Sequence, residues 1–230
     1  MSERTQMAYS MLSKPAFQTA FDLQGVPEPL REQFGYTKFG QSLLLAGRLV
    51  EAGVSLVTVN WDDETRHDKV SPFWDTHHDN FPKLKNHLCP IFDRAFSAFL
   101  ETLASRGLLD TTLVVVSGEF GRTPRIGKIS QNAMTQPTGR DHFPHAFTVL
   151  LAGGGVRGGM VYGATSPKGD RVIDRPVSPA DLAATIFRHL GVDAEQNYFD
   201  HFQNIPRSEE HTSELQSHSD LVCRLLLEKK

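Results

Sequence analysis

The chain has 230 residues, a formal net charge of −3 and an apolar fraction of 39%. This length suits one sizeable α/β domain or part of a larger protein, and the composition is that of an ordinary globular protein. The small net charge gives no sign of a basic surface for nucleic acid. No apolar run reaches the roughly 18 residues of a transmembrane helix, so no membrane span is expected. Cys89 and Cys223 are too few for a disulfide framework.

The first part of the chain, residues 1–36, is polar, contains prolines and shows no sustained apolar period. We interpret it as the lead-in segment of a truncated domain. Its start lacks the basic region and following apolar region of an export signal. An upstream segment outside this chain could still carry one.

Two helix–strand units follow in the sequence. Apolar residues at helical spacing predict a helix over 38–52, and Gly53 is a suitable stop after it. The β-branched run at 54–60 predicts a buried strand. The pattern recurs as a helix over 87–106 and a strand over 111–117.

A further strand is predicted over 147–153, and a helix over 178–191 that Ser178 caps, with Asp181 three residues later. Apolar runs that alternate with amphipathic helices indicate an α/β fold, a mostly parallel sheet with helices on both faces. Such a sheet binds ligands at the carboxyl ends of its strands. The loops after the predicted strands are therefore where function is expected.

The loop after the first predicted strand is rich in possible metal ligands. Imidazole and carboxylate are the groups that bind a catalytic zinc or a related divalent ion. Asp75 and His77 are two residues apart, so an extended segment would point both to one side. The alternative is a solvated loop with a few salt bridges. The acidic and histidine residues of this loop are Asp62, Asp63, His67, Asp68, Asp75, His77, His78 and Asp79.

Two more polar clusters lie beside later strands. Glu119 and Arg122 follow the strand over 111–117, and an arginine fork suits phosphate, sulfate or carboxylate. The alternative for this pair is a surface ion pair. Asp141 and His142 precede the strand over 147–153. The three clusters together favour metal-assisted chemistry, whereas each alone is weak.

The end of the chain, residues 207–230, does not resemble the rest. RSEEHTSELQS and DLVCRLLLEKK can each be encoded by a piece of a common sequencing-library adapter. We therefore interpret this segment as a translated, non-native tail and exclude it from the fold prediction. The alternative is a genuine amphipathic helix.

Several segments together resemble the bacterial domain-of-unknown-function 1501 family, whose members are sulfatase-like proteins of the alkaline phosphatase superfamily. The resemblance spans roughly residues 35–205. It implies a sulfatase/alkaline-phosphatase-like fold with metal at the strand ends. The segments are LLLAGRLVEAGVSLVTVNW, WDTHHDNF, RGLLDTTLVVVSGEFGRTP, GRDHFPHAF, LLAGGGVRGGMVYGATS and PVSPADLAATIFRHLG.

The resemblance also implies the ligands of a divalent metal cofactor, which could be zinc, calcium, magnesium or manganese. Asp75 and His77 match the aspartate and histidine ahead of a long helix, with Asp63 and His67 as a rival pair. His142 matches a final superfamily histidine that precedes a strand. The complete expected set is Asp75, His77, Glu119, Asp141 and His142.

One position departs from the superfamily pattern. Where an aspartate–histidine–glycine step is expected, the chain has Glu119, Phe120 and Gly121, and phenylalanine cannot bind a metal. A full two-metal site is therefore in doubt. We infer an oxyanion-binding role for the neighbouring Arg122.

The superfamily's nucleophile strand has no counterpart before residue 36, so the nucleophile is not expected in this chain. The expected organisation is a lead-in over 1–36, the C-terminal part of the domain over 37–206, and the tail over 207–230. The expected function is a truncated, inactive metal-dependent hydrolase of small-molecule phosphate or sulfate esters. Alternatives are a non-catalytic exported binding or surface protein and a phosphomutase-type transferase. The intact protein is expected to be exported or periplasmic.

Overall fold

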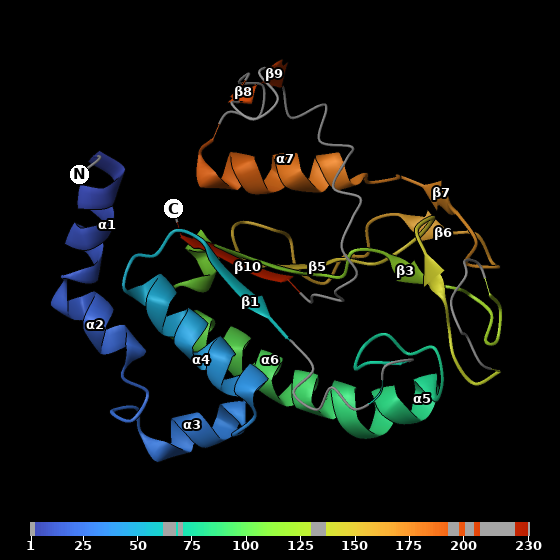
Figure 1. Ribbon diagram of the computed structural model, residues 1–230, viewed down its shortest axis with the longest axis horizontal. Helices are drawn as coiled ribbons and strands as arrows, with labels where there is room; N and C mark the ends of the chain where they lie inside the picture. The colour runs from blue at the N-terminus through green and yellow to red at the C-terminus, as the bar shows by residue number, and fades with distance from the viewer. Residues whose placement is uncertain are drawn as a thin grey trace.

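The protein has a mixed α/β fold, in which helices lie on both sides of a four-stranded sheet (Figure 1). Helices α4 and α6 lie on one side of the sheet and α7 on the other. The computed structural model describes residues 3–61, 68, 71–129 and 137–192 and the backbone of 198–200, 205–207 and 224–229.

Three short helices precede the first predicted element: α1 (Glu3–Leu12), α2 (Pro15–Phe21) and α3 (Glu28–Phe34). Helices α2 and α3 pack against α4, and Phe34 is fully buried. No helix was predicted over these three segments, and α2 and α3 have only seven residues each. A helix of two turns is too short to show an apolar period.

Helix α4 (Lys38–Glu51) forms where the apolar spacing predicted it. The Thr37 side chain caps its start by accepting a hydrogen bond from the Gly40 N–H at 3.1 Å. Gly53 follows its end with a φ of 92°, a conformation that suits glycine. The buried face of α4, which includes Leu43 and Val50, contributes to the core and supports the sheet above it.

The second predicted helix is confirmed as α6 (Cys89–Ser105), which packs against α4. It continues a helical segment that begins as α5 (Asn80–Lys83) and passes through a π-helical turn η1 (Leu84–Leu88). The helical segment begins at Asn80, directly after Asp79 of the acidic and histidine-rich loop. π-Helical turns are rare and frequently lie near functional sites.

The sheet contains β1 (Val57–Asn60), β2 (Thr112–Ser117), β5 (Leu150–Ala152) and β10 (Arg224–Lys229), in the order β1-β10-β2-β5. The three predicted strand segments are present, although β1 and β5 are shorter than expected. The segment interpreted as a tail supplies the backbone of β10.

The expectation of a mostly parallel sheet is not met, because every ladder between the described strands is antiparallel. β1 and β2 are both antiparallel to β10, so they run in the same direction. The helix-then-strand pattern correctly indicated that common direction. It did not reveal the reversed strand between them. The loops that follow β1 and β2 therefore begin at the same edge of the sheet.

The remaining elements are small. A short 3-10 helix, η2 (Leu109–Thr111), leads into β2, and the two-stranded pairs are β3 (Gly121–Arg122) with β4 (His142–Phe143), β6 (Ala164–Thr165) with β7 (Val172–Asp174), and β8 (Tyr198–Asp200) with β9 (Ile205–Arg207). Helix α7 (Pro179–Leu190) carries the predicted cap: Ser178 and Asp181 form a reciprocal capping box. Among the described helices, none is both long and apolar enough to cross a membrane.

An aromatic cluster packs Phe73 and Trp74 against Trp61, the residue after β1. Trp61 stacks on Phe39 of α4, with ring centroids 4.0 Å apart. Phe73 and Trp74 meet the Trp61 ring edge-on, at 5.1 Å and 5.3 Å. Burial and aromatic contact hold these rings in place. The residue directly after this cluster is Asp75.

Candidate metal centre

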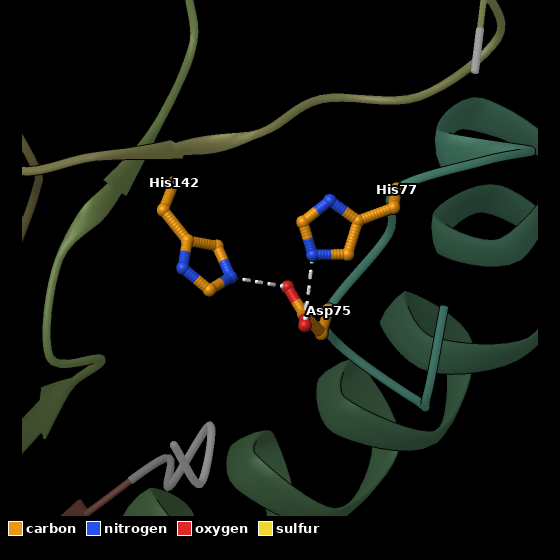
Figure 2. Close-up of side chains that lie close together, drawn as sticks. All are labelled: Asp75, His77 and His142. Atoms are coloured by element: carbon orange, nitrogen blue, oxygen red, sulfur yellow. Dashed lines mark hydrogen bonds and ion pairs between the residues drawn. The ribbon is translucent and has the colours of Figure 1, made fainter. Parts of the chain in front are cut away.

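Three predicted ligands gather at one point: Asp75, His77 and His142 (Figure 2). One ligand atom from each lies within 4.8 Å of the other two. His77 Nε2 is 3.0 Å from one carboxylate oxygen of Asp75, and His142 Nε2 is 2.9 Å from the other. The carboxylate thus lies between the two rings.

The segment that carries Asp75 and His77 is tightly folded. The Asp75 N–H donates to the Pro72 carbonyl at 2.8 Å, and the His77 N–H donates to the Asp75 carbonyl at 2.9 Å. Phe73 and Asp79, on either side, have φ values of 51° and 50°. Non-glycine residues rarely adopt this left-handed conformation, which clusters at functional sites.

A second loop, residues 137–142, is bound to this segment and brings His142 to it. Its Thr138 carbonyl accepts a hydrogen bond from the Asn80 N–H at 3.1 Å, and the Arg140 N–H donates to the Thr76 carbonyl at 2.9 Å. Gly139 lies so close to His77 that a Cβ there would be 1.8 Å from the His77 carbonyl oxygen. Only glycine permits this contact.

Strands β3 and β4 add a charged residue to the cluster. Their register places Arg122 directly opposite His142. The Arg122 guanidinium binds Asp75 at the same oxygen that faces His142. Its other terminal nitrogen, Nη2, is buried and has no hydrogen-bond partner in the described part of the chain. A buried unpaired donor is costly and calls for an explanation.

The charges around Asp75 keep it ionised. Burial is the largest influence and acts to raise the pKa of Asp75. The hydrogen bond from His142 and the charge of Arg122 outweigh it and lower the pKa from its usual 3.8 to about 2. The carboxylate therefore carries a negative charge at neutral pH, as a metal ligand requires.

The other two expected ligands, Asp141 and Glu119, are not members of the cluster, although Asp141 lies next to it. Asp141 is completely buried behind His77, with one carboxylate oxygen 3.8 Å from His77 Nδ1. Glu119 is exposed on the turn after β2 and is not a member of the three-residue cluster. The rival pair Asp63 and His67 lies outside the described residues.

The salt-bridge alternative applies to the rest of the histidine-rich loop. His78 Nε2 is 2.8 Å from Asp68 Oδ2, and Lys83 Nζ is 2.9 Å from the same oxygen. His78 Nδ1 is 3.2 Å from Asp79 Oδ2. These ion pairs lie within residues 68–83, whereas Asp75 contacts both His77 and His142. The described part of the loop therefore contains both the expected salt bridges and two of the expected metal ligands.

Phe120 and Thr123 shape the cluster through contacts that no sequence pattern revealed. The Phe120 ring packs on His142, with centroids 4.4 Å apart. The Thr123 hydroxyl accepts the Asp141 N–H at 3.1 Å. No spacing pattern marks these residues, because their contacts depend on the β3–β4 pairing. The ion pair between Arg122 and Asp75 was missed for the same reason.

The donor set fits a divalent metal. Two imidazoles and one carboxylate give three protein ligands, the number at which a catalytic zinc keeps an open position. A carboxylate behind a metal-binding imidazole, as Asp141 lies behind His77, is also typical of such sites. Asp75, His77 and His142 could therefore hold a metal ion.

Comparison with curated proteins finds no match, and neither does comparison with solved structures. One family profile matches nearly the whole sequence, over residues 1–217. The match extends on both sides beyond the segments in which the resemblance was recognised. The chain therefore belongs to the family described as protein of unknown function DUF1501.

Proposed function

We propose that Asp75, His77 and His142 bind one divalent metal ion and that this centre serves the hydrolysis of a small-molecule phosphate or sulfate ester. The observation that carries the proposal is the position of Asp75, whose two carboxylate oxygens each face the Nε2 of a different histidine. Three loops distant in sequence supply the cluster and Arg122. A purely structural ion pair would not need two imidazoles on one carboxylate.

Arg122 supports the choice of an anionic substrate. One arm of its guanidinium binds Asp75, and the other, Nη2, is buried and unpaired. A tetrahedral oxyanion beside the cluster would accept a hydrogen bond from Nη2, since the arginine fork suits phosphate and sulfate. A metal held here would polarise the ester oxygen and offset the charge that develops on it. The proposal assigns no nucleophile within this chain.

A sulfatase/alkaline-phosphatase-like architecture is part of the same proposal. Its support is the common direction of β1 and β2, with the cluster built from loops that follow them. A full two-metal centre is not proposed, because the ring beside His142 is that of Phe120, which cannot bind a metal.

The test is metal binding, followed by hydrolysis. Isothermal titration with Zn²⁺, Mn²⁺, Mg²⁺ and Ca²⁺ should give one site for at least one ion, and Asp75→Ala should abolish it. A matched control is Asp110→Asn, which changes an exposed carboxylate on η2. Wild-type protein that binds none of the four ions would refute the proposal. Hydrolysis of aryl phosphate or aryl sulfate is then measured for the metal-loaded chain and for a longer form that supplies a nucleophile.

The second candidate function is binding without catalysis, as in an exported surface protein. The ion pair between Arg122 and Asp75 favours it, because an arginine engaged with a ligand carboxylate is only partly available to a substrate. Metal binding without any turnover by the longer form would support this alternative.

A further inference from the structure

Asp141 is a buried carboxylate that the metal proposal leaves without a role. Asp141 is completely inaccessible to solvent. Burying a carboxylate is costly unless charged or hydrogen-bonding partners compensate it. One oxygen, Oδ1, accepts the His142 backbone N–H at 2.8 Å and lies 3.8 Å from His77 Nδ1. Asp141 therefore contacts both histidines of the cluster from behind.

The backbone of Asp141 is fixed as firmly as its side chain. Its N–H donates to the Thr123 hydroxyl at 3.1 Å, and its carbonyl accepts the Thr123 N–H at 2.9 Å. These two bonds hold the backbone of Asp141, and the His142 N–H holds its carboxylate. Its carboxylate is thus held on the Nδ1 side of His77, while Nε2 faces Asp75.

We infer that Asp141 is a positioning residue that acts through His77 and His142 and is not itself a metal ligand. The inference rests on the proposed metal function. A carboxylate near Nδ1 favours the ring form in which Nδ1 carries the hydrogen. Nε2 then keeps its lone pair for the ion. The distance of 3.8 Å is an electrostatic contact, because it is too long for a hydrogen bond.

The test compares two substitutions that differ in what they keep. Asp141→Asn keeps an oxygen that can accept the His142 N–H and attract the Nδ1 hydrogen. Asp141→Leu keeps the approximate size but no acceptor. Zn²⁺ titration should show a loss of affinity of about 10- to 100-fold for the leucine variant, a smaller loss for the asparagine variant, and one site in both. Asp110→Asn, at the far end of β2, should bind like wild type.

Two titration results would overturn the inference. If both variants abolish Zn²⁺ binding as Asp75→Ala does, Asp141 is a ligand. If neither variant changes the affinity, Asp141 has no influence on the site. The asparagine variant keeps the test decisive if the leucine variant does not fold.

A second readout follows the ring form of His77 directly. In the metal-free protein the Asp75 carboxylate, 3.0 Å from Nε2, favours a hydrogen on Nε2, so the measurement is made with Zn²⁺ bound. Long-range ¹H–¹⁵N NMR of the Zn²⁺-loaded wild type should show a hydrogen on His77 Nδ1, and this hydrogen should exchange faster in Asp141→Leu. A bare Nδ1 in the loaded wild type would overturn the inference. Wild-type protein that binds no Zn²⁺ refutes the proposed function instead.

Discussion

The contact between the two ligand-bearing loops gives the sharpest prediction, through the substitution Gly139→Ala. The added Cβ would lie 1.8 Å from the His77 carbonyl oxygen, 2.0 Å from the His77 carbonyl carbon and 2.5 Å from the His78 nitrogen. Real Cβ atoms essentially never approach closer than 3.0 Å. All three neighbours are backbone atoms, so no side-chain rotation can relieve the overlap.

The loops must therefore separate by about 1 Å or more, which costs about 1–3 kcal/mol of folding free energy on the scale of overpacked sites. Gly139 does not have a positive φ, so alanine adds no conformational strain and the effect is purely steric. The same separation moves His77 relative to His142. Displaced ligands should weaken the affinity for Zn²⁺ by about 10- to 100-fold, as for other changes that disturb ligand orientation.

The assay measures urea unfolding and Zn²⁺ affinity for Gly139→Ala beside Gly158→Ala. Gly158 also lacks a positive φ, and a Cβ there meets nothing within 4 Å, so this control should behave like wild type in both measurements. Wild-type stability and affinity in Gly139→Ala would refute the close approach of the two loops. A loss of stability with unchanged affinity would refute the link between this contact and ligand placement.

Three further predictions concern charge, capping and metal. The pKa of Asp75 is lowered to about 2. Its contribution of about 2 kcal/mol should therefore be fully present above pH ~4 and disappear as the pH falls through 2. The difference in unfolding free energy between wild type and Asp75→Asn, measured from pH 5 to pH 2, should shrink accordingly, and a constant difference would contradict this. Ser178→Ala removes the hydroxyl that accepts the Asp181 N–H at 3.2 Å and should cost about 1 kcal/mol in thermal unfolding. An unchanged melting temperature would rule out the capping box. Excess Zn²⁺ at about 100 times Kd should raise stability by about 2.7 kcal/mol, and a chelator should reverse the gain. Asp75→Ala should show no such gain, and an equal gain in that variant would place the ion elsewhere.

Local patterns in the sequence predicted local structure well. The apolar spacing of α4 and α6, the β-branched run of β2 and the Ser178 cap of α7 are all confirmed. Each depends on residues that are close in the chain. The direction of the strand between β1 and β2 was not predictable in this way, because strand pairing depends on distant segments.

In the candidate site, too, the ligand residues were predictable from local patterns, whereas contacts between distant segments were not. Asp75, His77 and His142 were expected to meet, since each lies beside a strand, and they do. Arg122 was expected to face a substrate, but it also binds Asp75, through a β3–β4 pairing that no sequence pattern marks. Glu119 leaves the end of β2 as expected, but it lies on an exposed turn.

The bonds to Asp75 span long stretches of the chain. Arg122 is 47 residues away from Asp75 in sequence and His142 is 67 residues away. An ion bound by Asp75 and His142 would therefore act as a cross-link that closes a loop of that length. Closing so long a loop removes much of the freedom of the unfolded chain, as a disulfide between the same positions would. Such an ion would raise the free energy of unfolding by restricting the unfolded chain, and its removal would return that freedom.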